Sequence, residues 1–428
     1  MKFSNFGFIT VLLLAVMGLS RTSVAQDKLV SVEDSINQEL PQVEMPTPPR
    51  KWFETIKISG YVQSRYNGLF ETNPDLAVEQ MDKNWGADKG LSLRRVRVKV
   101  SGWIHEKVYM YIQGDFAGEF SLKDAYMDLY LDDNKSLWVR AGQSKVPFGY
   151  ENMQSSQHRL PLDRSDAINS ALKNERDMMA VLYYTPEPAR EVYKYLKANN
   201  LKHSGNYGAF ALGAFNGQTA NKKDENDNLH TVVRASYPFQ FANDQIMELS
   251  VHAYTGKYVT TSVSEGVGVS DASGERIADD ANGYNFIDRR VGATFVWYPQ
   301  PIGFQAEYNY GEGPEYDGAT NTIKVQDLHG AYAMVMGKFD IGHHTFFPFT
   351  RYIYYDGGKK FELDARSYEV NDLEIGIEWQ PHKAFELVAM YVFADRRYDD
   401  SASSFNDGVY TPNYQAGNIL RLQAQINF

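Results

Sequence analysis

The feature of this sequence that most constrains its fold is an alternation of apolar and polar side chains that persists over long segments. In residues 420–428 the two kinds of side chain occupy opposite parities, with Leu420, Leu422, Ala424, Ile426 and Phe428 against Arg421, Gln423, Gln425 and Asn427. Successive side chains of a β-strand point to opposite faces, so a period of two predicts strands with one apolar and one polar face. A helix repeats about every 3.6 residues and does not produce this pattern.

The same alternation recurs in about sixteen segments, and we expect each of them to be a strand. They lie near residues 56–67, 91–102, 105–117, 122–132, 136–146, 177–185, 206–215, 228–238, 246–258, 285–298, 302–311, 326–339, 343–356, 369–380, 384–396 and 418–428. Many reach the roughly 9–11 residues that a tilted strand needs to cross a membrane, whereas strands of globular proteins have about 5–6 residues.

The connections between these segments differ in length. Short ones include 102–106, 132–135 and 299–301, and long ones include 70–90, 148–176, 258–284 and 395–417. Short turns on one rim and long loops on the other are the layout of a transmembrane barrel. We therefore predict an all-β fold, a single antiparallel transmembrane β-barrel of about sixteen strands over residues 54–428, with long extracellular loops and short periplasmic turns.

Soluble all-β folds fit the sequence less well. A β-sandwich also alternates, but its strands are shorter, and a β-propeller would repeat a motif roughly every 40–50 residues, which this sequence does not do. A final amphipathic strand that ends in Phe428 is typical of bacterial outer-membrane proteins. The 29 Tyr and 24 Phe are enough to form the aromatic girdles of a membrane barrel. The mean hydropathy of −0.46 is compatible with this fold, because only alternate strand residues would face lipid.

The first residues have the pattern of an export signal. Lys2 precedes the apolar stretch 8–19 and the small residues that end at Ala25, which predicts a signal peptide over 1–25. Residues 26–53 are acidic and rich in proline, and they predict an extended periplasmic tether. An exported barrel is expected in the bacterial outer membrane, in contact with its lipid and lipopolysaccharide.

If the apolar parity faces lipid, the polar parity lines the interior. The basic residues expected to line a pore or to contact anions are Arg65, Arg94, Arg95, Arg97, Lys99, Arg140, Lys145, Arg159, Arg234, Arg290 and Arg421. The acidic residues expected in the lumen are Asp115, Asp124, Asp128, Glu307, Glu374, Glu378 and Glu386. The row Arg95, Arg97 and Lys99 stands out, because like charges on one strand face repel each other unless something offsets them. Either the row attracts anions, or carboxylates of neighbouring strands neutralise it.

The segment 148–176 is a long connection without strand alternation, and residues 166–173 within it predict a short helix. A connection of this length that folds into the lumen would set the narrowest point of the barrel. The alternative is an ordinary surface loop, since long loops are often functional but need not turn inward.

Several classes of function are disfavoured. The chain has no Cys, and it contains no hydrolase, metalloprotease or phosphate-binding loop motif. We therefore expect a protein that is not an enzyme, with no catalytic residue, no cofactor and no metal. The net charge of −11 argues against nucleic acid as a partner.

The stretch 91–216 resembles the phosphate-selective porin O and P family. The resemblance rests on the runs Leu93-Arg94-Arg95-Val96-Arg97, Asp124-Ala125-Tyr126, Arg140-Ala141-Gly142-Gln143-Ser144-Lys145-Val146-Pro147-Phe148-Gly149 and Phe215-Asn216-Gly217. It implies a sixteen-stranded homotrimeric channel with its third loop folded inward and a ladder of arginines that leads anions to a constriction. Arg94 and Arg95 match an arginine pair of that ladder. The residue after Gly60, basic in phosphate-selective members, is Tyr61 here.

These observations together predict a water-filled channel for passive diffusion of small hydrophilic solutes and ions. Anions are expected to be somewhat favoured at the wall from Arg94 to Lys99. The alternative is a barrel plugged by its own loops that serves as a structural or docking component of an envelope complex.

Overall fold

The structure, a computed structural model, describes residues 51–69, 90–269, 284–399, 401, 405–406, 409–410 and 413–428. The predicted signal peptide and all but the last residues of the predicted tether lie outside the described residues. A single turn of 3-10 helix, η1 (Trp52–Thr55), leads into the first strand.

Sixteen long strands lie where the alternation predicts them. In chain order they are β1 (Lys57–Leu69), β2 (Gly90–His105), β3 (Val108–Asp115), β4 (Ser121–Tyr130), β5 (Leu137–Lys145), β6 (Arg176–Tyr184), β7 (Phe210–Phe215), β8 (His230–Gln240), β9 (Ile246–Thr260), β11 (Tyr284–Trp297), β12 (Ile302–Asp317), β13 (Thr322–Gly337), β15 (His344–Gly358), β16 (Ser367–His382), β17 (Phe385–Asp399) and β20 (Asn413–Asn427). Short strands are β10 (Gly268–Val269), β14 (Phe339–Ile341), β18 (Phe405–Asn406) and β19 (Val409–Tyr410).

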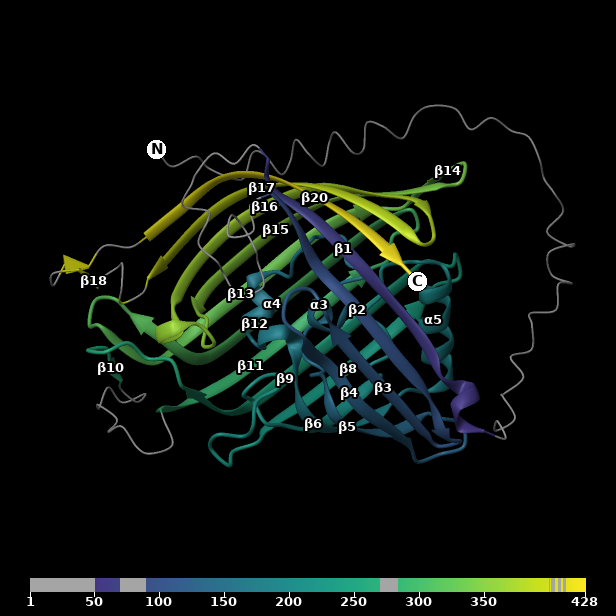
Figure 1. Ribbon diagram of the computed structural model, residues 1–428, viewed down its shortest axis with the longest axis horizontal. Helices are drawn as coiled ribbons and strands as arrows, with labels where there is room; N and C mark the ends of the chain where they lie inside the picture. The colour runs from purple at the N-terminus through teal and green to yellow at the C-terminus, as the bar shows by residue number, and fades with distance from the viewer. Residues whose placement is uncertain are drawn as a thin grey trace, which may run out of the picture. The chain divides into compact units, whose positions relative to one another are not determined.

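The long strands form a closed ring. Each pairs antiparallel with the next long strand along the chain, and β20 pairs with β1, where Tyr61 lies opposite Asn427. Reciprocal backbone hydrogen bonds of 2.8 and 3.0 Å join Gly60 to Phe428 at this seam. Figure 1 shows the strands tilted around an interior. The predicted closed antiparallel barrel of 16 strands is confirmed.

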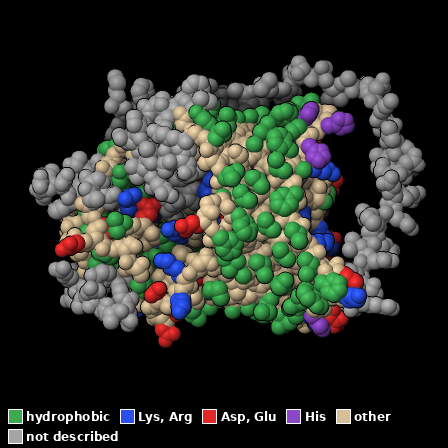
Figure 2. Space-filling model, in the orientation of Figure 1, with side chains coloured by type: hydrophobic (Ala, Val, Ile, Leu, Met, Phe, Trp, Pro, Cys, Tyr) green, Lys and Arg blue, Asp and Glu red, His purple; other side chains and the backbone are tan. Residues whose placement is uncertain are grey.

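Apolar side chains of the strands lie on the outside of the barrel and charged side chains lie in its interior, which is the reverse of a soluble protein. On β20, Ile426 is 55% exposed, whereas Arg421 is fully buried. Figure 2 shows apolar side chains spread across the outer surface of the barrel, with charged side chains gathered toward its rims. An apolar outer surface and a polar interior are the arrangement that a barrel needs in a bilayer.

Helices are short and lie in the connections. Those of the connection 146–175, between β5 and β6, are α3 (Tyr150–Met153), α4 (Asp166–Asn169) and the 3-10 turn η3 (Lys173–Glu175), and the turn η4 (Leu363–Ala365) follows β15. The helix expected within residues 166–173 is present as α4. Within the described ranges, no helix is both long and apolar enough to span a membrane.

One longer helix, α5 (Glu187–Ala198), lies in the connection 185–209 between β6 and β7. The connection 185–209 lies on the rim where the other connections are short turns. The prediction of short turns along this rim is therefore not met between β6 and β7. Ala189, Tyr193 and Leu196 are spaced as on one helix face. They are buried against side chains of β9 and β11, so α5 packs onto the barrel instead of projecting from it.

Gly330 of β13 allows the connection 146–175 to approach the wall closely. A Cβ at Gly330 would lie 2.7 Å from the Cα of Ala167 in α4, a distance that real Cβ atoms do not show. Asn309 of β12 donates a hydrogen bond of 2.6 Å to the Ala167 carbonyl. Figure 1 shows α4 beside β12 and β13, which it contacts.

Val251 of β9 is 59% exposed on the apolar outer face of the barrel. A substitution there tests whether this face meets lipid. We expect Val251→Arg to lower the free energy of unfolding by about 2–4 kcal/mol, since a charge on the lipid face of a barrel is costly. Urea unfolding in lipid vesicles measures the difference, with Val251→Leu as the matched control. Equal stability of the two variants would contradict a lipid-facing position.

Candidate functional site

The predicted charged residues are gathered inside the barrel. Among the basic residues, Arg94 and Lys99 are half-buried, and those that are buried are Arg65, Arg95, Arg97, Arg140, Lys145, Arg159, Arg234, Arg290 and Arg421. The acidic residues Asp115, Asp124, Asp128, Glu307, Glu374, Glu378 and Glu386 are all buried. A buried charge is stable only when it is paired or hydrogen-bonded, so the partners of these residues decide what the interior can bind.

Asp163, in the connection 146–175, brings together arginines of three strands. Its carboxylate lies 3.0 Å from Arg65 of β1, 2.7 Å from Arg421 of β20 and 3.8 Å from Arg94 of β2. Burial raises the pKa of this carboxyl, but Arg421, Arg65 and Arg94 outweigh burial and hold the pKa well below its usual range. Sequence reasoning missed Asp163, because one acid in a long loop forms no pattern.

A β-bulge explains how Arg94 and Arg95 both reach the interior. In the pairing of β1 with β2, Gln63 lies opposite Arg95. The next pair is Ser64 with Leu93, so Arg94 has no residue opposite it. A strict period of two would turn one of the two arginines toward lipid. The extra residue of the bulge breaks the alternation locally, so both arginines, which were predicted to lie in the interior, can do so.

Carboxylates of neighbouring strands neutralise further predicted cations. The nitrogen–oxygen distances are 2.8 Å for Arg97–Asp115, 2.7 Å for Arg140–Asp128 and 3.4 Å for Arg234–Glu248. Of the two possibilities left open for the basic row of β2, neutralisation by a neighbouring strand therefore holds for its central member, Arg97.

The connection 146–175 supplies acids to cations that sequence reasoning did not single out. Glu151 pairs with Arg351 of β15, and Asp166 pairs with Arg396 of β17 at 2.8 Å. Each of these acids lies far along the chain from its partner. The connection is therefore held to several strands by charge.

The remaining predicted acids are also engaged. Asp124 pairs with Arg176 at 3.0 Å, Glu374 with Arg351 at 2.6 Å and Glu378 with Lys202 at 2.5 Å, and Glu386 accepts a hydrogen bond of 3.0 Å from Asn427. Glu307 of β12 accepts the backbone N–H groups of Tyr150 and Glu151, the latter at 3.0 Å. Glu307 thus stabilises the start of α3.

A second group of predicted cations makes no salt bridge with a carboxylate in the described part of the chain, namely Arg95, Lys99, Lys145, Arg159 and Arg290. Lys145, Arg159 and Arg290 donate hydrogen bonds to groups of the connection 146–175. Arg95 donates to Gln63 at 3.0 Å, and its buried Nε has no hydrogen-bond partner in the part of the chain that the structure describes. Lys99 donates to Gln157 at 2.5 Å. Among the described residues, positive charge therefore remains uncompensated on β2.

The connection 185–209 meets the connection 146–175 from the opposite rim. Gln154 donates a hydrogen bond of 2.6 Å to the carbonyl of Lys202, whose ammonium group reaches β16 through Glu378. The rings of His158 and His203 face each other, with centroids 6.5 Å apart and planes inclined by 20°. The two connections thus touch each other and span between strands on different sides of the barrel.

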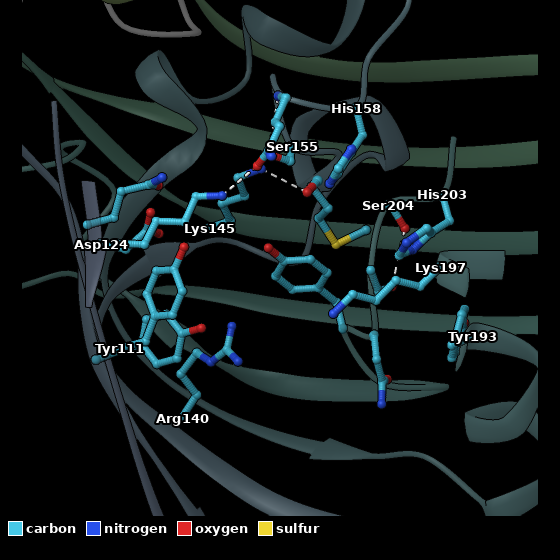
Figure 3. Close-up of a pocket in the computed structure, with 18 of the residues that line it drawn as sticks. Tyr111, Asp124, Arg140, Lys145, Ser155, His158, Tyr193, Lys197, His203 and Ser204 are labelled. Atoms are coloured by element: carbon cyan, nitrogen blue, oxygen red, sulfur yellow. Dashed lines mark hydrogen bonds between the residues drawn. The ribbon is translucent and has the colours of Figure 1, made fainter. Parts of the chain in front are cut away.

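A cavity of about 530 Å³ lies between the inner face of β2–β5 and these two connections. Its basic lining residues are Lys99, Arg140, Lys145, Arg176, Arg190, Lys194 and Lys197, and its acidic lining residue is Asp124. Figure 3 shows Tyr111 and Arg140 on one side of the cavity and Lys197 and His203 on the other. Within the described residues, no cluster of His, Asp or Glu could hold a metal ion.

The sequence matches the family described as phosphate-selective porin O and P over residues 73–428. The chain belongs to this family. Among solved structures, it is similar to the outer-membrane channel DcaP of Acinetobacter baumannii, with a TM-score of 0.51 and 14% identity over 87% of this chain and 97% of that one. It is also similar to OprB of Pseudomonas putida, with a TM-score of 0.49 and 10% identity over 88% and 94% of the two chains. No curated protein matches the sequence.

Family and fold make this porin an outer-membrane channel protein. The resemblance first noted over residues 91–216 is confirmed over most of the chain. At the position after Gly60, the structure shows what replaces the basic residue that the resemblance implies. Tyr61 is fully buried, and its hydroxyl lies 2.7 Å from the hydroxyl of Ser156. Tyr61 therefore ties β1 to the connection 146–175 and adds no charge.

Asp163 gives a test of the charge balance. Asp163→Asn removes the charge that faces Arg65 and Arg421, so we expect the free energy of unfolding to fall by about 3–5 kcal/mol. We also expect the reversal potential in a KCl gradient to shift toward anions. Asp133→Asn is the matched control, because it removes an exposed acid that pairs with Lys107 at 2.7 Å. Indistinguishable behaviour of the two variants would contradict the role assigned to Asp163.

The two facing histidines make a prediction about pH. Burial is the main cause that lowers the pKa of His158 to about 3, followed by Lys202, His203, Lys99 and Lys197. Burial and Lys197 lower the pKa of His203 to about 4. Both rings are therefore neutral between about pH 5 and pH 8, although an imidazole in an unfolded chain gains its proton near about pH 6.5.

We therefore expect the wild-type protein and a His158→Gln/His203→Gln double variant to have the same ion selectivity between about pH 5 and pH 8. Below the folded pKa values, protonation adds positive charge only in the wild type, which should then favour anions more than the variant does. Reversal potentials recorded across the pH range measure this. A difference already present near neutral pH would show that the rings carry charge there.

Proposed function

We propose that this porin forms a water-filled channel for passive diffusion of small hydrophilic solutes and ions, and that it favours anions. The observation that carries the proposal is the charge state of β2. Arg95 and Lys99 face the interior without a carboxylate partner among the described residues, while Arg97 between them is paired with Asp115. Fixed positive charge in a narrow polar interior attracts anions and repels cations.

The acids near this wall support the anion preference, because they are already engaged. Asp115 and Asp128 hold Arg97 and Arg140, and Asp124 holds Arg176. A carboxylate that is bound to a guanidinium offers little negative charge to a passing cation. The charge of this wall that has no partner within the described ranges is therefore positive.

Further parts of the proposal rest on the family resemblance and on the sequence. The connection 146–175 narrows the lumen, a role supported by its ion pairs with β1, β15, β17 and β20. Residues 1–25 direct export, and the protein assembles as a homotrimer in contact with lipid and lipopolysaccharide. The substrates are small solutes and anions, and the basic residues on the inner face, Arg95 and Lys99 above all, are the ones that contact them.

A second candidate function has one observation in its favour. The connections 146–175 and 185–209 meet inside the ring, where Gln154 contacts Lys202. A barrel closed by these connections would serve as a structural or docking component of the envelope. Planar-bilayer recording separates the two functions, since a porin conducts with an ohmic current and a plugged barrel of correct fold stays closed.

The charges of β2 are tested by the double variant Arg95→Gln/Lys99→Gln. We expect its reversal potential in a KCl gradient to shift toward cations, because two uncompensated positive charges are removed from the inner wall. Lys383→Gln is the control for the loss of a cation, since Lys383 is exposed in the turn between β16 and β17. Arg95→Lys keeps the charge and is expected to keep the selectivity. An unchanged reversal potential in the double variant would mean that permeating ions do not meet these side chains.

A further inference from the structure

We propose that the cavity between β2–β5 and the connection 185–209 is a binding site for small organic anions that carry an aromatic ring, such as an aryl carboxylate. This inference rests on the proposed function and names the class of solute that the channel would hold. Three properties of the cavity support it, namely its size, its charge and the rings in its wall.

The size of the cavity admits a small organic molecule. Its volume of about 530 Å³ lies within the range of about 300–1,000 Å³ that is typical of small-molecule sites. A water molecule occupies about 30 Å³ in the liquid, so the space holds a molecule with a ring and a carboxylate together with several water molecules.

The charge of the cavity favours an anion. Lys99 from β2 and Lys197 from α5 line it from opposite sides, and neither makes a salt bridge with a carboxylate of the described chain. Asp124, the acid in the lining, is held by Arg176 at 3.0 Å. The lowered pKa of His203, caused by burial and then by Lys197, agrees with a field that is positive at this place. A negatively charged group would therefore be stabilised between the two lysines.

The rings in the wall favour an aromatic body on that anion. Tyr111 of β3 and Tyr126 of β4 stack with centroids 5.1 Å apart and planes inclined by 16°. The guanidinium of Arg140 covers the Tyr126 ring at 3.8 Å. Tyr111 and Tyr207 line the cavity while only half-buried, so part of their surface is open to a ligand. A planar ring can extend a stack of this kind, whereas a saturated ring of the same size cannot.

Hydrogen-bonding groups complete the lining. The connection 185–209 contributes Ser204 and Asn206, and the connection 146–175 contributes Ser155. Figure 3 shows Ser155 and Ser204 at the border of the cavity, on different segments. Neutral donors of this kind orient a carboxylate that the lysines attract, and they fix no particular substituent on the ring.

The experiment measures equilibrium binding to the purified full-length protein in detergent by isothermal titration calorimetry. The probes are benzoate, cyclohexanecarboxylate, which has the same charge and a similar size, and inorganic phosphate. We expect benzoate to bind about 2- to 10-fold more tightly than cyclohexanecarboxylate, the ratio that corresponds to an aromatic contact. Phosphate is expected to bind more weakly than either carboxylate. Equal affinities for the two carboxylates, or tighter binding of phosphate, would overturn the inference.

Two variants separate the contributions of ring and charge. Tyr111→Leu keeps an apolar side chain and should abolish the preference for benzoate over cyclohexanecarboxylate. Lys197→Gln, on an exposed position of α5, should weaken the binding of both carboxylates and keep the preference. Lys383→Gln, outside the cavity, should leave both affinities unchanged. If benzoate binds to the Tyr111 or Lys197 variant as it does to the wild type, the site lies elsewhere and the inference fails.

Conductance in KCl, recorded on the same preparations, tests the channel function independently of the aromatic anion site. An ohmic current without preferential benzoate binding would retain the porin function and reject the aromatic anion site. Preferential benzoate binding without a current would support the site and reject passive diffusion.

Discussion

Charge neutralisation across the interior of the barrel is the constraint on which the rest of the structure depends. An ion removed from water without a partner costs several kcal/mol, yet the walls turn inward the fully buried cations Arg65, Arg351, Arg396 and Arg421. The connection 146–175 carries the acids Glu151, Asp163 and Asp166 that pair with them. Wall and connection therefore stabilise each other, and the connection cannot move away without leaving buried charges on both sides.

This division of charge determines where the interior remains open to an anion. The acids of the connection face β1, β15, β17 and β20, and those of β3 and β4 face the cations next to them. Arg95 and Lys99 have no such partner in the described chain, and the cavity lies beside Lys99. Space and uncompensated positive charge thus coincide on the inner side of β2–β5. Arg65, Arg94 and Arg421, by contrast, already have a carboxylate partner in Asp163.

The fold could be predicted from the sequence because its main constraint is local. The period of two compares each residue with its neighbours, so all the long strands were predictable near their observed positions. The bulge at Arg94 leaves a trace, because the apolar parity changes from Leu91 and Leu93 to Val96 and Val98, but sequence reasoning treated this segment as one unbroken strand. The helix α5 has a readable signal in Ala189, Tyr193 and Leu196, but it covers only three turns within a chain dominated by alternation. The pair of Glu151 and Arg351, 200 residues apart, has no local pattern at all.

The position of α5 bears on how a solute would pass the junction of the two connections. At that junction Lys202 is bound to Gln154 and to Glu378, and Tyr193 of α5 is buried against the wall. Groups that are held on both sides do not move aside easily, so a path through the junction would require several contacts to break at once. The cavity that Lys99 lines lies beside this junction, against the inner face of β2–β5. For a proposed anion channel, the selective step then falls at lysines and tyrosines on this face, and the arginines around Asp163 act mainly to hold the connection 146–175 in place.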